Sequence, residues 1–138
     1  MPVDDYAVTI ELPMRWGDMD ALGHANNARY FTWFESVRIE YFQRLGLRVD
    51  KPREIGPILA TTTCDFLRPV TWPAQLVVGA RVPRLGNTSF TMEYALAVAD
   101  APDELCARGS GVIVLVDYLR GTKVPIPDDL RAAIEELG

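Results

Sequence analysis

Residues 27–45, NARYFTWFESVRIEYFQRL, decide the fold of this chain. Apolar residues recur in this stretch at steps of three and four, which is the spacing of one face of an α-helix. They are Tyr30, Phe34, Val37, Tyr41 and Leu45, and Phe31, Trp33, Ile39 and Phe42 widen the stripe. Such an apolar helix is expected to be wrapped by other structure rather than to lie on a surface.

Capping residues mark the expected limits of this helix, and charged residues mark one of its faces. Asn26 or Asn27 is expected to be the N-cap, and Gly46 is expected to stop the helix at its C-terminal end. The charged side chains Arg29, Glu35 and Arg38 are expected on a solvated or interfacial face.

The rest of the chain is dominated by segments typical of β-strands. Alternating apolar residues predict a half-buried strand at 6–14, and four more strands are predicted at 57–67, 75–83, 88–99 and 105–117. Short connectors favour antiparallel pairing of neighbours. The segment PIPDD at 125–129 is expected to open a short helix that ends at Leu137. Together these segments predict a single α+β domain over residues 1–138, with a curved antiparallel sheet of about five strands around the long helix.

Composition narrows the class of protein. The 138 residues include 14 basic and 19 acidic side chains, a net charge of −5, and 49% are hydrophobic. These values are typical of one globular domain and argue against a sequence-independent nucleic-acid binder. No run of about 18 apolar residues predicts a membrane span. The start of the chain does not resemble a signal peptide, and Cys64 and Cys106 are expected to be reduced, so a cytoplasmic location is expected.

The segment at residues 15–30, RWGDMDALGHANNARY, carries the candidate chemistry. Asp18 and Asp20 precede His24, the single histidine of the chain, and Gly23 allows a positive φ angle. A carboxylate can attack a carbonyl or activate a water, and the free N–H groups at a helix start can hold an oxyanion. The combination therefore suits acyl transfer. A capped loop without any chemical role explains the same residues, because Asp and Asn are favoured in turns and caps.

The segment DMDALGHANNARY resembles the signature D-x-D-x-x-G-H-x-N-N-x-x-Y of hotdog-fold acyl-CoA thioesterases, in particular the 4-hydroxybenzoyl-CoA thioesterase-like group. The segments DFLRPV at 65–70 and VPIP at 124–127 extend the likeness over nearly the whole chain. The resemblance implies that Asp20 is the catalytic carboxylate and that the Asn27 N–H polarises the thioester carbonyl. It also implies that Gly23 and His24 line the same turn.

A second group of residues is a candidate coenzyme site. No acidic residue lies between Asp65 and Glu93, an interval that holds Arg68, Arg81 and Arg84. Arginine, glycine and hydroxyl residues follow one another at 84–89, and such a turn can donate hydrogen bonds to phosphates. In the resembled family this turn contacts the nucleotide of coenzyme A. The residues singled out are Arg84, Asn87, Thr88 and Ser89, with Arg68 in addition. An ordinary hairpin is the alternative.

The helix aromatics have two interpretations as well. Most are expected in the core, and Tyr30 and Phe34, which lie closest to the motif, are candidates for the lining of an acyl pocket.

The function expected from these features is hydrolysis of an acyl-CoA thioester, with Asp20 as nucleophile or general base. A non-catalytic acyl-CoA-binding hotdog module and a hotdog enoyl-CoA hydratase are the alternatives. No cofactor is expected beyond the coenzyme A of the substrate, and no metal, because ligand spacing is lacking. The resemblance also implies a homodimer or homotetramer.

Overall fold

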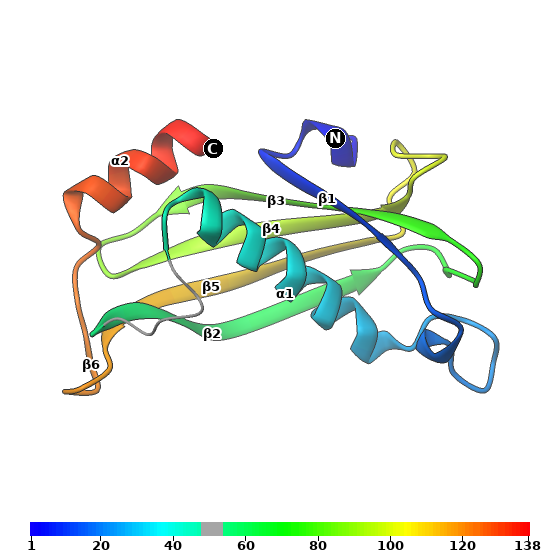
Figure 1. Cartoon of the computed structure of the whole chain (residues 1–138), viewed down its shortest axis with the longest axis horizontal. Helices are drawn as coiled ribbons and strands as arrows, with labels where there is room; N and C mark the ends of the chain where they lie inside the picture. Colours follow the sequence, from blue (N-terminus) through cyan, green and yellow to red (C-terminus); the bar gives the residue numbers. More distant parts are fainter. Residues whose placement is uncertain (48–53) are drawn as a thin grey trace.

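The computed structural model describes residues 1–47 and 54–138, which form one curved antiparallel sheet with α1 lying across its concave face (Figure 1). The elements in chain order are η1 (Val3–Asp5), β1 (Val8–Pro13), η2 (Trp16–Asp18), α1 (Asn27–Arg44), β2 (Ile55–Phe66), β3 (Gln75–Leu85), β4 (Ser89–Val98), β5 (Ala107–Asp117), β6 (Thr122–Lys123) and α2 (Asp128–Leu137). The predicted α+β class, the long helix and the short C-terminal helix are confirmed. The short elements η1, η2 and β6 were not predicted.

The order of the strands corrects one expectation from the sequence. The strands are arranged β1-β3-β4-β5-β2, with β6 beside β5, so β2 does not neighbour β3 although a short connector joins them. That connector, residues 67–74, crosses the end of the sheet and is held there, since the Arg68 amide donates to the Cys106 carbonyl at 3.1 Å. Eight extended residues reach about 26 Å, more than the spacing of the strands that they cross. β2 therefore becomes an edge strand.

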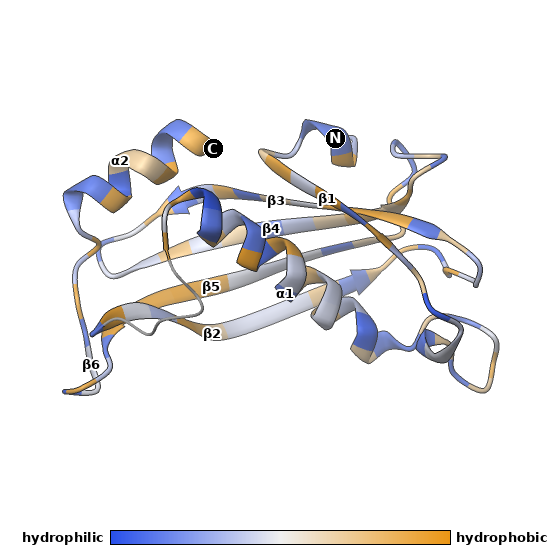
Figure 2. Ribbon diagram, viewed as in Figure 1, coloured by the Kyte–Doolittle hydropathy of each residue, from blue (hydrophilic) through white to orange (hydrophobic). Residues whose placement is uncertain are grey.

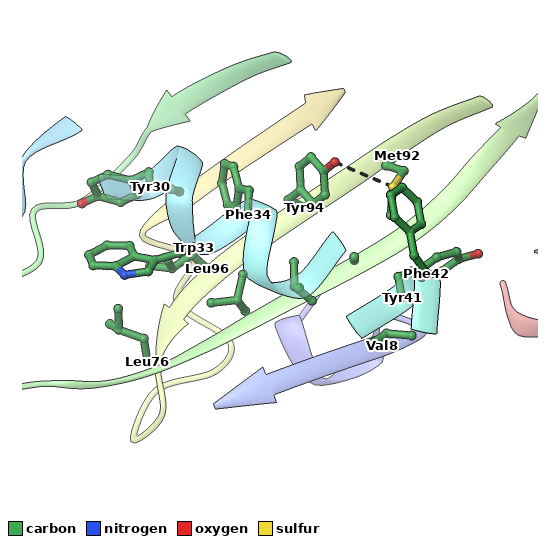
Figure 3. Packing of buried hydrophobic residues seen from close by; sticks show 14 of the residues in the cluster. Val8, Tyr30, Trp33, Phe34, Tyr41, Phe42, Leu76, Met92, Tyr94 and Leu96 are labelled. Carbon is green, nitrogen blue, oxygen red and sulfur yellow. Dashed lines mark hydrogen bonds between the residues drawn. The ribbon is translucent and has the colours of Figure 1, made fainter. Parts of the chain in front are cut away.

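The core lies between α1 and the sheet. Phe34 and Tyr94 are fully buried, and their rings stack with centroids 5.0 Å apart (Figure 3). Gly109 of β5 makes this close approach possible, because a Cβ atom there would lie 2.5 Å from the Phe34 ring and 2.6 Å from the Thr63 carbonyl oxygen. A helix with large aromatic side chains can therefore lie directly on the central strands.

The N-terminal segment covers part of the opposite, convex face of the sheet. Val3 and Tyr6 are buried there against Val77, Ala95 and other small side chains of β3 and β4. This second apolar layer explains why β3 and β4 have buried residues on both faces.

Hydrophilic residues lie at both ends of α1 (Figure 2), and its buried side chains run from Tyr30 to Phe42. Asn26 is the N-cap, and its side chain accepts a hydrogen bond from the Ala28 amide at 3.0 Å. Gly46 has a φ of 82° just beyond the last turn, as its expected role as a stop requires. No helix within the described ranges is long and apolar enough to cross a membrane.

Arg38 does not lie on a solvated face of α1, which was one of the two expectations for its charged residues. Glu35 is 60% exposed in its side chain, and Arg29 is partly exposed, but Arg38 is only 8% exposed and is buried with the core residues. Its guanidinium donates from Nη1 to the Tyr94 hydroxyl at 3.1 Å. The long side chain can turn under the helix because Tyr94 supplies a polar partner within the core.

Candidate functional site

The signature segment forms a tight hairpin that presents Asp20 to solvent. Met19 and Ala25 pair as an isolated β-bridge, and the Asp20 amide donates to the His24 carbonyl at 2.8 Å. Gly23 has a φ of 79°, which is why a glycine suits this position. The Asp20 side chain accepts from the Leu22 amide at 2.8 Å through Oδ1. Within the part of the chain that the structure describes, Oδ2 of Asp20 accepts no hydrogen bond, so one carboxylate oxygen is available.

Asp18 holds this hairpin to the rest of the site. Its side chain is 2% exposed, accepts from the Arg15 amide at 2.7 Å, and forms ion pairs with Arg15 at 3.6 Å and Arg29 at 3.5 Å. Its main-chain carbonyl accepts from the Asn26 amide at 2.8 Å. Asp18 therefore ties the loop to the first turn of α1 through charge-assisted contacts.

The N–H group of Asn27, at the start of α1, has no acceptor within the described residues. The Asn26 side chain and carbonyl accept from the Ala28 and Arg29 amides, at 3.0 and 2.9 Å. The Asn27 amide donates to no acceptor among residues 1–47 and 54–138. This N–H points out of the positive end of the helix dipole, where a developing negative charge is stabilised.

His24 lies in the same hairpin, where it is exposed beside Asp20. Its main chain is fixed by the bond from the Asp20 amide, and its imidazole has no hydrogen bond within the described ranges. The exposed imidazole is therefore accessible to a ligand.

The cysteines are not candidates for the nucleophile. Burial raises the pKa of Cys64 to about 11, with a smaller contribution from Asp65, and burial also raises the pKa of Cys106. Both are free thiols, and at neutral pH they remain protonated and weakly nucleophilic.

Three of the predicted binding residues lie on the same side of the molecule as the hairpin. The Tyr30 ring meets that of Phe66 edge to face, at a centroid distance of 4.9 Å, and burial raises the pKa of Tyr30 to about 12. Phe34 is fully buried one turn further along α1. Arg68 is exposed on the connector beside the hairpin, paired with Glu104 at 3.6 Å. These positions do not test whether the three residues contact an acyl-CoA, so those contacts stay predictions.

The other four predicted binding residues lie at the opposite end of the sheet from the hairpin. β3 begins at Gln75, which pairs with Pro13 close to the hairpin, and ends at Leu85. Its eleven residues span about 35 Å. Arg84, Asn87, Thr88 and Ser89 lie at this far end, where Arg131 donates to the Gly86 carbonyl at 2.7 Å. Arg84 is exposed and forms no ion pair within the described residues. One chain therefore does not bring Asp20 and Arg84 together.

A pocket of about 650 Å³ lies at this same far end, between the end of α1, the start of β2 and the start of α2. It is lined by Leu45, Leu47, Ile55, Leu115 and Leu130 among others. The Leu115 amide donates to the Thr88 carbonyl at 2.9 Å, so the pocket adjoins the turn. No sequence pattern indicates this pocket, because its walls come from four separate segments.

The described residues hold no cluster of three or more His, Cys, Asp or Glu side chains that suits a metal ion. The exposed polar groups at the hairpin are a carboxylate, an imidazole and a helix-start amide. These groups suit attack on a carbonyl compound.

Comparison with known proteins supports this chemistry. The Thioesterase-like superfamily model matches residues 14–134. A putative thioesterase from Pseudomonas aeruginosa, PA2801, is 35% identical, with a TM-score of 0.87 and coverage of 94% of this chain and 99% of that one. A thioesterase from Thermus thermophilus, solved with coenzyme A and Zn, is 31% identical with a TM-score of 0.81, over 96% of this chain and 94% of that one.

A chloroplastic acyl-acyl carrier protein thioesterase of Arabidopsis thaliana, ATL3, is 27% identical over 89% of this chain and 65% of its own length. The family model covers most of the chain, and relatives above 30% identity share its whole fold. The chain belongs to the Thioesterase-like superfamily of hotdog-fold thioester hydrolases.

Proposed function

We propose that the protein hydrolyses acyl-CoA thioesters at the hairpin, with Asp20 as the reacting carboxylate. The observation that carries this proposal is the uncommitted Asn27 amide at the start of α1, beside a hairpin that presents an exposed carboxylate. Coenzyme A in the Thermus thermophilus thioesterase supports the choice of thioester.

The reaction begins with the thioester carbonyl oxygen accepting a hydrogen bond from the Asn27 N–H. Asp20 either attacks the carbonyl carbon directly or removes a proton from an attacking water. A carbon–oxygen bond forms, the carbon–sulfur bond breaks, and the thiolate of coenzyme A leaves and takes up a proton. In the direct route, water then cleaves the acyl–Asp20 anhydride. The N–H stabilises the oxyanion in both routes.

We further propose that two chains pair through β2 to complete the site. β2 is a twelve-residue edge strand with exposed apolar side chains, among them Ile58 and Leu59. The other edge, β1, is half as long and ends in Pro13. A long, apolar edge favours pairing with another strand. Antiparallel self-pairing of β2 would place the hairpin end of one chain beside the Arg84 end of its partner.

The catalytic role is tested with Asp20→Asn, assayed by thiol release from a panel of acyl-CoA esters. Asp5→Asn, which removes another exposed carboxylate in the first residues, is the matched control. We expect the Asp20 variant to lose turnover and keep its melting temperature, whereas the control keeps both. Undiminished thiol release by the Asp20 variant would refute the assignment. Hydration of an enoyl-CoA, followed separately, would identify a lyase instead.

The composite site is tested by mixing two variants that are each impaired, Asp20→Asn and Arg84→Ala. If Arg84 serves the partner's hairpin, each mixed dimer regains one complete site, and activity at low substrate concentration exceeds that of both parents. If both residues act within one chain, mixing gives only the average of the parents.

A further inference from the structure

Among the residues that the structure describes, Arg38 is a buried cation without a full set of partners. Its side chain is 10% exposed, and its one hydrogen bond to a described residue runs from Nη1 to the Tyr94 hydroxyl at 3.1 Å. The carboxylate of Glu35 is 3.8 Å from Nη2, beyond hydrogen-bond distance, and is 60% exposed. Nε and Nη2 donate to nothing else within the described residues. A desolvated guanidinium with so few acceptors is costly to the chain alone.

The two guanidinium nitrogens without a hydrogen bond to a described residue, Nε and Nη2, are accessible to solvent. In the part of the chain that the structure describes, no fully buried side-chain nitrogen or oxygen lacks a partner. Nε and Nη2 of Arg38 therefore reach accessible surface. A guanidinium edge with two free donors matches a carboxylate, because both groups are planar and form paired hydrogen bonds.

The hydrogen bond from Nη1 to Tyr94 places the Arg38 guanidinium near β2. The Tyr94 hydroxyl lies over Gly111, since a Cβ atom on that glycine would be 3.3 Å from it and 3.1 Å from the Leu59 side chain of β2. Phe31 lies two helical turns before Arg38 on the same face of α1. Phe31 and Leu59 are both 37% exposed. Arg38 thus lies near two exposed apolar side chains, Phe31 of α1 and Leu59 of β2, which we call the apolar strip.

The strip begins where the proposed reaction takes place. Arg38 follows Asn27 by eleven residues of one helix, a distance of about 16 Å along its axis. The arginine side chain leans toward the start of α1, which shortens this distance. An acyl chain of medium length, bound to the Asn27 amide by its carbonyl and laid along Phe31, would bring its far end to Arg38.

We propose that Arg38 recognises a carboxylate at the far end of the acyl group, so that the preferred substrates are ω-carboxyacyl-CoA thioesters. This inference rests on the proposed function at Asp20 and names its substrate class. The incoming carboxylate takes the free edge of the guanidinium, and the mostly exposed Glu35 turns to solvent. Glu35 thus competes with the substrate carboxylate for Arg38 and weakens binding of the substrate.

The test compares Arg38→Met with the wild type on matched pairs of thioesters: adipoyl-, suberoyl- and sebacoyl-CoA against hexanoyl-, octanoyl- and decanoyl-CoA. Met has a similar length without the charge. We expect the wild type to prefer one carboxylated member, and Arg38→Met to reduce the ratio of kcat/KM values, carboxylated over plain, by about tenfold or more. Glu35→Gln, which leaves the core unchanged, is expected to raise the same ratio.

Two results would overturn the inference. One is an unchanged ratio in folded Arg38→Met and in Glu35→Gln. The other is an equal loss on both members of each pair together with a weakened dimer, which would mean that a carboxylate of the second copy occupies Arg38. Failure of the proposed function is distinguishable, because the wild type would then release no thiol from any member of the panel.

Discussion

Removing the buried Asp18 carboxylate is expected to damage both stability and turnover, unlike removal of Asp20 two residues later. Asp18→Ala deletes a charge-assisted hydrogen bond to the Arg15 amide of 2.7 Å and two ion pairs of 3.5 and 3.6 Å. A hydrogen bond to a charged group contributes about 1.5–3 kcal/mol, and pairs with exposed arginines add about 0.2–1 kcal/mol each. The expected loss is therefore about 2–5 kcal/mol, or roughly 6–15 °C in Tm for a chain of this size.

The same variant is expected to slow the reaction, because Asp18 ties the hairpin to the first turn of α1. A small displacement of a reacting group costs on the order of tenfold to a hundredfold in rate. Thermal unfolding followed by circular dichroism, together with thiol release, measures the two effects. Asp18→Asn keeps an acceptor for the Arg15 amide and is expected to lie between wild type and Asp18→Ala.

Asp20→Asn completes the comparison, since Asp20 is exposed and makes one local hydrogen bond. It is expected to lose activity without losing stability. The reasoning would be refuted if Asp18→Ala melted like the wild type, or if Asp20→Asn were the more destabilised of the two.

Three further changes probe other parts of the molecule. Gly109→Ala places a Cβ atom 2.5 Å from the Phe34 ring and should cost about 1–3 kcal/mol in urea unfolding, whereas Gly17→Ala, with no atom within 4 Å, should be nearly neutral. Tyr41→Phe removes the 2.9 Å bond to the Gly138 carbonyl and should cost about 0.5–1.5 kcal/mol. Burial raises the pKa of Tyr41 from 10.0 to about 12, so its contribution to stability is complete below pH 10 and lost as the pH rises through 12. Alkaline unfolding of the Phe variant should lack this component. Arg84→Ala should raise KM for acyl-CoA more than for a truncated thioester without the nucleotide, and equal effects on both would remove Arg84 from the coenzyme site.

Sequence patterns predicted the parts of this fold that depend on local periodicity. The three- and four-residue spacing of aromatics predicted α1, and the cap at Asn26 and the positive φ of Gly23 follow from the preferences of these residue types. The long strands were found within a few residues of their observed ends. These features are determined by residues close together in the sequence, so the sequence alone is enough to predict them.

The features that the sequence did not predict depend on contacts between distant segments. β2 lies at an edge because its connector crosses the end of the sheet, and no local pattern specifies that crossing. Arg38 is buried because Tyr94, 56 residues away, offers a hydroxyl within hydrogen-bond distance. In the sequence it looked like any charge on the polar side of an amphipathic helix. The separation of Asp20 from Arg84 likewise follows from the length of β3.

The packing of the core determines where a substrate can bind. The space between α1 and the central strands is filled by the stacked rings of Phe34 and Tyr94, and Gly109 lets the Phe34 ring lie directly against β5. Apolar surface remains exposed beside the helix, at Phe31 and Leu59. If an acyl chain binds at the Asn27 amide as proposed, we expect it to follow the side of α1 toward β2. In a single chain that path is open to solvent, and a second copy paired through β2 would close it.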